Sequence, residues 1–163
     1  MNMTERYRRW FEYEKDAHLK VLASLDRVPE PGKSDAAFQK AVDLFAHIVA
    51  ARMMWLHRFG ATVETPKEMF PKGVGLNELQ SRVDRMHNAW SNYLAGLEDC
   101  DLERVFEYNA FEGPRYRSVV EDILTQLFGH SLYHRGQIAA LVRSLDGEPA
   151  VTDFVFWTRE SLP

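Results

Sequence analysis

Cysteine is nearly absent from this sequence, which has a single one, Cys100, among 163 residues. One thiol cannot form a disulfide within the chain, so we expect no disulfide framework. This scarcity agrees with a reducing compartment, where disulfides are rare. We expect Cys100 to lie near a helix end, and we assign it no catalytic role.

Long apolar runs are also missing, since no stretch approaches the roughly 20 residues that cross a bilayer. The segment 1–10 is polar and carries charges of both signs, unlike the apolar stretch of a signal peptide. We therefore expect a cytoplasmic protein that does not span or bind a membrane.

Basic residues are not in excess, because the formal net charge is -4 and no dense Lys/Arg cluster occurs. Nucleic-acid binding draws much of its affinity from such clusters, so we expect no DNA or RNA partner. The hydrophobic share of 45% and the charged share of 27% are those of a globular protein. A chain of this length fits a single domain, which we place over residues 1–163.

Apolar residues recur at helical spacing in four segments that are separated by Pro- and Gly-bearing connections. Ser34 or Asp35 can cap the second segment, and Ser118 with Glu121 forms the Ser-x-x-Glu pattern of a capping box before the fourth. The predicted helices cover approximately residues 4–27, 34–60, 77–98 and 118–145.

The pattern changes between residues 101 and 117, where aromatic and β-branched residues surround Gly113 and Pro114. Phe106, Tyr108 and Phe111 belong to this stretch, which predicts a short extended hairpin or an ordered loop. The fold class that we expect is all-α: a four-helix bundle with this hairpin or loop before the last helix.

Two histidines occupy the apolar stripe of the fourth predicted helix, at His130 and His134. Residues four apart on a helix point in nearly the same direction, about 6 Å apart along the axis. Burying two neighbouring imidazoles without partners is unfavourable, and a shared metal ion removes that penalty. Pairs with this spacing also arise by chance, so the pair alone does not establish a metal site.

His47 is the best candidate for a third ligand, because it lies mid-helix on the apolar stripe of the second predicted helix. A lone histidine in such a place is more often a hydrogen-bonded core residue. With His130 and His134 it would form a mononuclear site with open positions, which suits zinc or nickel. The alternative is a buried hydrogen-bond network of histidines without a metal.

The remaining histidines rank lower as ligands. His57 is rotated by about 80° from His47 and lies near a helix end, and His87 flanks the stripe of the third helix. Glu14 and His18 adjoin the apolar face of the first helix. Either could therefore bind the metal directly or hydrogen-bond one of the residues that bind it.

Residues that follow the histidine pair are candidates for binding a cofactor or substrate. Gln137 falls on the same stripe and can hydrogen-bond an imidazole or a bound ligand. Arg135 can hold a carboxylate of a substrate or of another helix, or it can form a surface salt bridge. Gly136 costs about 1 kcal/mol relative to alanine within a helix, which predicts a close approach of a backbone or a ligand.

The stretch Gly-His-Ser-Leu-Tyr-His-Arg-Gly-Gln-Ile at 129–138 resembles the signature of the DinB/YfiT-like family of metalloenzymes. Its spacing to His47, the Trp-Leu-His-Arg at 55–58 and the tail from Gly147 to Phe154 resemble that family too. The resemblance covers nearly the whole chain. Gly129 departs from it, since family members often carry Asn there.

The resemblance implies an up-down-down-up four-helix bundle, usually a homodimer, with a metal held at His47, His130 and His134. It also implies transfer or isomerisation reactions that use a low-molecular-weight thiol such as bacillithiol, mycothiol or glutathione. The tail aromatics Phe154 and Trp157, with Phe156 between them, are candidates for covering another subunit.

Two functions follow from these observations. The first is an enzyme in which a metal lowers the pKa of a bound thiol or water, giving a nucleophile that attacks a small electrophile. The second is a metal-binding stress-response protein without turnover. An accessible, polar-lined metal site favours the enzyme, and a metal saturated by protein ligands favours the second function.

Overall fold

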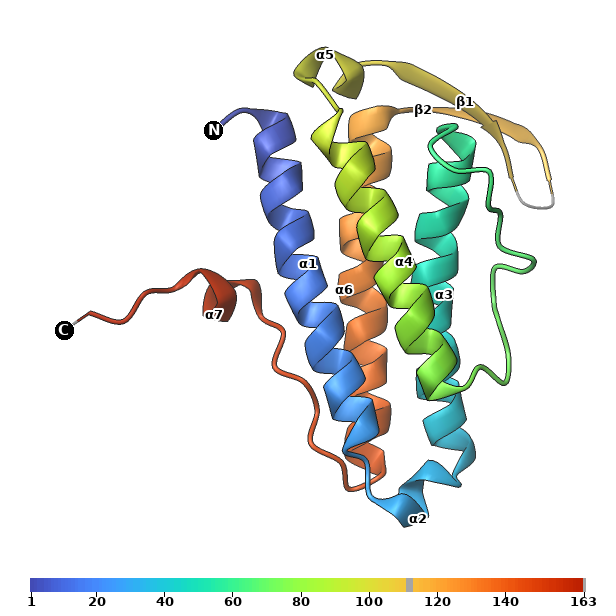
Figure 1. The fold of residues 1–163 in the computed structure, drawn as a ribbon, viewed down its shortest axis with the longest axis vertical. Coiled ribbons are helices and arrows are strands. Elements are labelled where there is room, and N and C mark those ends of the chain that lie inside the picture. The colour runs from blue at the N-terminus through green and yellow to red at the C-terminus, as the bar shows by residue number, and fades with distance from the viewer. Residues whose placement is uncertain (111–112, 163) are drawn as a thin grey trace.

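The computed structural model describes residues 1–110 and 113–162, which are mostly helical. Four long helices lie side by side (Figure 1). Three short helices and one two-stranded sheet complete the described part. The long helices are α1 (Met3–Asp26), α3 (Ala36–Arg58), α4 (Leu76–Ala95) and α6 (Val120–Ser144). The short elements are α2 (Glu30–Lys33), α5 (Asp99–Leu102), α7 (Phe154–Thr158), β1 (Val105–Asn109) and β2 (Arg115–Val119).

Helices α1 and α6 run in one direction and α3 and α4 in the other (Figure 1). α3 packs against α6 and α4, and α1 packs against the same two helices. Their apolar stripes meet in one core that includes Phe45, Leu79 and Trp90, each at most 1% exposed. Burial of these stripes supplies most of the stability of such helices. Within the described residues, no helix is long and apolar enough to cross a membrane.

The ends of the helices follow the sequence signals in part. Asp35 caps α3, because its side chain accepts a hydrogen bond from the Ala37 backbone N–H. The capping box predicted at Ser118 and Glu121 is wrong, since α6 starts after Val119 without a side-chain cap. Ser118 is instead paired with Phe106 in the β-ladder. The strand continues to the first turn of the helix and places Ser118 outside the capping position.

The predicted hairpin is present as the antiparallel pair β1 and β2, with Val105 opposite Val119 and Asn109 opposite Arg115. It covers the end of α3, where the guanidinium of Arg58 lies over the rings of Trp55 and Tyr108 at 4.6 and 5.0 Å. Phe111, which the sequence placed in this hairpin, lies outside the described residues. α6 begins directly after β2, so the hairpin also sets where α6 starts.

A long connection from residue 59 to residue 75 runs beside α3 and α4 (Figure 1). Its ends are fixed by hydrogen bonds. The Ala61 N–H donates to the Leu56 carbonyl at 2.9 Å, and the Val74 N–H donates to Asp43 Oδ1 at 3.2 Å. Gly73 has φ = 67°, a value that favours glycine because it lacks a Cβ.

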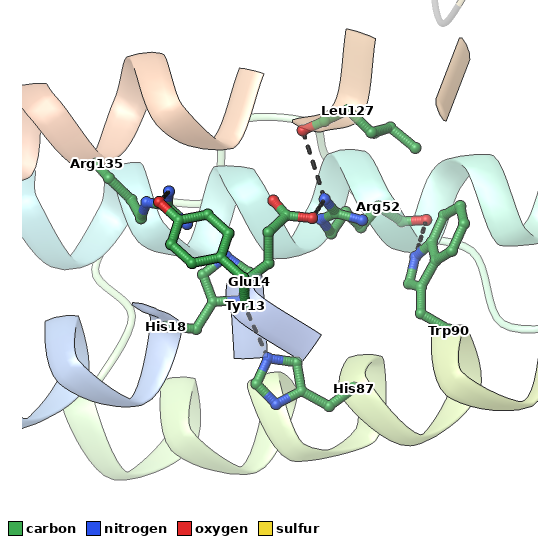
Figure 2. A network of polar contacts seen from close by, with 8 residues as sticks. All are labelled: Tyr13, Glu14, His18, Arg52, His87, Trp90, Leu127 and Arg135. Carbon is green, nitrogen blue, oxygen red and sulfur yellow. Dashed lines mark hydrogen bonds and ion pairs between the residues drawn. The ribbon is translucent and has the colours of Figure 1, made fainter. Parts of the chain in front are cut away.

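Arg52 of α3 is buried among the four long helices, as Figure 2 shows. Its guanidinium forms an ion pair with Glu14 of α1, and it donates to the Leu127 carbonyl of α6 at 3.5 Å. The Arg52 carbonyl accepts a hydrogen bond from Trp90 Nε1 of α4 at 3.1 Å. One residue of α3 therefore contacts each of the other three long helices.

A histidine pair lies beside this ion pair (Figure 2). His18 Nδ1 and His87 Nε2 are 3.0 Å apart, and both side chains are buried. Burial lowers the pKa of His87 to about 4, and burial also lowers the pKa of His18 well below 6.5. Both rings are therefore neutral near pH 7, and one ring donates a hydrogen bond to the other.

Replacing Arg52 by methionine should lower the free energy of unfolding by about 3–5 kcal/mol, because it leaves the Glu14 carboxylate buried without its partner. The double variant Arg52→Met with Glu14→Leu should recover much of this loss. Urea denaturation followed by circular dichroism measures both. A double variant as unstable as Arg52→Met would contradict the unpaired-charge explanation.

Acid should destabilise the metal-free protein, and His87 should contribute to this. An unfolded histidine titrates near pH 6.5 and folded His87 near 4, so between these values the unfolded state binds more protons. Stability then falls as the pH drops from 6.5 to 4, by at most about 1.4 kcal/mol per pH unit from this residue. His87→Gln keeps a hydrogen-bonding group and removes this proton. Its urea midpoint should fall less steeply with pH than that of the unchanged protein.

Candidate metal centre

Three imidazoles from two helices converge at one point. α3 contributes His47, and α6 contributes His130 and His134, whose ligand nitrogens all lie within 4.8 Å of one another. His130 Nε2 is 3.0 Å from His47 Nε2 and 3.1 Å from His134 Nε2. The structure therefore brings together the three residues that the sequence selected as metal ligands.

The outer nitrogens of two of these rings are held by oxygen acceptors. His47 Nδ1 lies 2.6 Å from the Met69 carbonyl oxygen, and His134 Nδ1 lies 2.7 Å from Gln137 Oε1. An oxygen without a hydrogen can only accept, so each Nδ1 carries the proton and donates it. This leaves the lone pairs of His47 Nε2 and His134 Nε2 directed at the common centre, as in metal sites whose ligands are oriented by a second hydrogen bond.

The three central nitrogens have too few protons to bond to one another. The lone pairs of His47 and His134 face inward, and His130 can offer a single N–H. This N–H can donate a well-formed hydrogen bond to one of the two lone pairs and not to both. A cation at the centre would satisfy every lone pair. Two nitrogens on one tetrahedral zinc ion lie about 3.3–3.4 Å apart, close to the 3.0 and 3.1 Å that separate His130 Nε2 from the Nε2 atoms of His47 and His134. These residues therefore fit a divalent metal ion.

Burial keeps two of the imidazoles, those of His47 and His130, in their metal-binding form. Burial lowers the pKa of His130 to about 4, with a further contribution from the neighbouring His134 and His47. Burial also lowers the pKa of His47, partly opposed by its hydrogen bond to the Met69 carbonyl. Neutral imidazole is the form that ligates metals, and at pH 7 no proton has to leave these two rings.

Two aromatic side chains border the cluster near the surface. The Phe70 ring stacks on His47 with centroids 4.2 Å apart, and Phe70 is 62% exposed. The Tyr133 ring meets His134 edge-on at 5.0 Å and is 66% exposed. His47 and His134 are buried and His130 is half-buried, so the centre lies just beneath the surface.

Gln137 accepts a hydrogen bond from His134, which is one of the two contacts that the sequence indicated for it. Arg135 is 3% exposed, and its guanidinium donates to the Tyr13 hydroxyl at 2.7 Å (Figure 2). It lies in the interior of the helices, and its part in binding a cofactor stays a prediction. Gly136 faces open space, so nothing in the described chain approaches it closely. The close approach expected there is not found among the described residues.

The other candidates lie elsewhere. Glu14 is occupied by its ion pair with Arg52, and His18 by its contact with His87. Neither belongs to the group that could hold the ion. His57 is exposed near the end of α3, as its position indicated.

Sequence reasoning missed Met69 and Phe70, which lie in the connection between α3 and α4. Met69 acts through its backbone carbonyl, which every residue type possesses. Phe70 stands in a segment without helical periodicity, so no spacing connects it to His47. No signal in the sequence alone could have identified these two contacts.

The sequence profile of the DinB family matches residues 1–161. This chain belongs to the DinB family. The match includes all four long helices and the three converging histidines, so the family resemblance read from residues 129–138 is confirmed. No curated protein and no solved structure matches the chain.

In this DinB-family protein, Gln137→Ala should weaken zinc binding about 10- to 100-fold, because His134 loses the acceptor that orients its ring. Competition with a chromophoric chelator measures the zinc dissociation constant. Gln80→Ala is the matched control, since the Gln80 amide bonds Asp84 on the surface of α4. Unchanged zinc affinity in Gln137→Ala would show that His134 does not depend on this contact.

Proposed function

We propose that this DinB-family protein binds one divalent ion, zinc or nickel, through His47, His130 and His134, and uses it in a thiol-dependent transfer or isomerisation on a small electrophile. The observation that carries the proposal is the convergence of three Nε2 atoms, two of them on rings whose Nδ1 protons are held elsewhere. Such an arrangement directs the Nε2 lone pairs of His47 and His134 at the common centre.

A divalent ion bound here would supply Lewis acidity, lowering the pKa of a thiol or water at an open position. The donor set supports this role because three neutral imidazoles do not offset the charge of the ion. Catalytic zinc sites use three protein ligands, whereas structural sites fill four. Phe70 and Tyr133 add exposed aromatic surface beside the histidines, where an apolar substrate group can pack.

Arg135 and Gln137 take different parts in this proposal. Gln137 holds the proton of His134 Nδ1 and so keeps the ring oriented. Arg135 was expected to bind a cofactor, yet its guanidinium donates to Tyr13 inside the protein. Its role at the site is then one of fixing α6 against α1, and a thiol would meet it only after that contact is broken.

We infer that the four long helices form a single up-down-down-up bundle over residues 1–163 in a cytoplasmic protein. Their directions in Figure 1 and their shared apolar core support the bundle. The long connection between α3 and α4 also supports it, because these consecutive helices run in the same direction.

We also propose a homodimer. Of the tail aromatics, Phe154 and Trp157 pack on Tyr13 of the same chain, with centroids 5.0 and 5.9 Å away. Phe156 remains 45% exposed and Val155 58% exposed. Together with the exposed Val151 and Leu162, these side chains are available to contact a second copy.

The purified, untagged protein should contain about one equivalent of metal by elemental analysis after incubation with zinc or nickel. Alanine at His47, His130 or His134 should each abolish this metal, and His57→Ala, which removes an exposed histidine, should retain it. A metal-free protein after incubation with zinc, nickel and manganese would refute the metal site.

Light scattering of the same preparation tests the homodimer and should give twice the chain mass.

Turnover separates the enzyme from a metal-binding stress-response protein. The metal-loaded protein is mixed with glutathione, bacillithiol or mycothiol and 1-chloro-2,4-dinitrobenzene, in which the thiolate sulfur displaces chloride. Thioether formation that His130→Ala abolishes supports the enzyme. Stoichiometric metal without acceleration of this or other thiol reactions favours the metal-binding protein.

A further inference from the structure

A cavity of about 340 Å³ lies between α3, α4 and the connection 59–75, separate from the three histidines. Its volume is in the range of small-molecule sites in proteins. Its lining residues come from three segments of the chain. They are Ala46, Val49, Ala50 and Met53 of α3, Glu78, Arg82 and Arg85 of α4, and Glu64, Thr65, Pro66, Lys67, Glu68 and Pro71 of the connection.

The floor of the cavity is apolar and is made by one face of α3. Ala46, Val49, Ala50 and Met53 are spaced by three, one and three residues, so they share a single side of the helix. This side is rotated about 100° from His47, which faces α6. The same helix therefore presents the histidine to the metal centre and an apolar strip to the cavity.

The walls of the cavity carry charges of both signs. On α4, Arg82 forms an ion pair with Glu78 at 2.5 Å, so each neutralises the other. Arg85 on the same wall has no ion pair among the described residues. Glu64 and Glu68 on the opposing connection have none there either. The connection also contributes Lys67, which has no ion pair among the described residues, so this wall carries two negative charges and one positive charge. Arg85 thus lies across the cavity from a wall of net negative charge, above an apolar floor.

We propose that this cavity binds a small zwitterion with an apolar side chain, of the amino-acid or short-peptide class. Its carboxylate pairs with Arg85, its ammonium group with Glu64 or Glu68, and its apolar part covers the floor formed by α3. A purely anionic or purely cationic molecule would meet a wall of like net charge on one side. If water alone filled the cavity, the apolar side chains of its floor would stay in contact with water, which is unfavourable.

The cavity and the metal centre share one short stretch of chain. Pro66, Lys67 and Glu68 line the cavity, and the next two residues, Met69 and Phe70, contact His47. A molecule in the cavity would therefore press on the segment that orients this histidine. The site itself is formed without any of the three metal-ligating candidates, so it stands whether or not a metal binds.

Three matched probes test the proposal: leucine, 4-methylpentanoate, which lacks the ammonium group, and 3-methylbutylamine, which lacks the carboxylate. Each is titrated into the full-length protein by isothermal calorimetry or ligand-observed NMR. Leucine should bind at least tenfold more tightly than either of the others. Similar affinities for all three, or no saturable binding of leucine, would overturn the proposal.

Charge-removing variants locate the binding. Arg85→Gln should weaken leucine binding about tenfold and leave 3-methylbutylamine unaffected, and Glu64→Gln with Glu68→Gln should weaken leucine without affecting 4-methylpentanoate. Arg143→Gln, an exposed arginine of α6 outside the cavity, is the control. Arg85 is exposed, so its loss should not disturb folding. Leucine binding that is unchanged in Arg85→Gln would refute the assignment.

Leucine can also chelate a metal, so binding at the histidines must be distinguished from binding in the cavity. The titrations are repeated with EDTA-treated protein and with His130→Ala. Cavity binding persists in both, even if no metal site exists. Binding that disappears in both would place leucine on the metal and would overturn the cavity proposal.

Discussion

The guanidinium of Arg52 is buried where the four long helices meet, and the packing of the interior is arranged around this charge. Glu14 neutralises it from α1, the Leu127 carbonyl approaches it from α6, and Trp90 binds its backbone from α4. A buried charge that loses its partner is strongly destabilising. Sliding any of the three neighbouring helices along α3 would remove one of these contacts, so together they favour one register.

That register also positions the histidines. α3 and α6 run in opposite directions (Figure 1), and Arg52 faces Leu127. Moving five residues back along α3 leads to His47. Moving five residues forward along α6 leads to position 132, midway between His130 and His134. The contact at Arg52 therefore sets His47 between the two histidines of the partner helix. A slip by one helical turn, about 5.4 Å, would separate them beyond the reach of one ion.

The sequence predicted those features that periodicity controls. The four helical segments and the shared direction of His130 and His134 follow from a repeat of 3.6 residues, and His47 was found because a histidine is conspicuous on an apolar stripe. Features that depend on contacts between distant segments were not predictable. Glu14 and Arg52 are 38 residues apart, and nothing in either helix alone indicates that they pair. Ser118 matched a capping pattern, but the hairpin extended past it.

The hydrogen bond from His47 to the Met69 carbonyl at 2.6 Å is, within the described residues, the one hydrogen bond that ties residues 62–73 to the helices. The acceptor is a backbone atom, so any amino acid at position 69 can provide it. Substitutions there can accumulate over evolution without loss of the contact, while an inserted or deleted residue nearby would displace it. Relatives of this protein should therefore preserve the spacing around this position more strictly than its identity, and a comparison that scores residue types would overlook it.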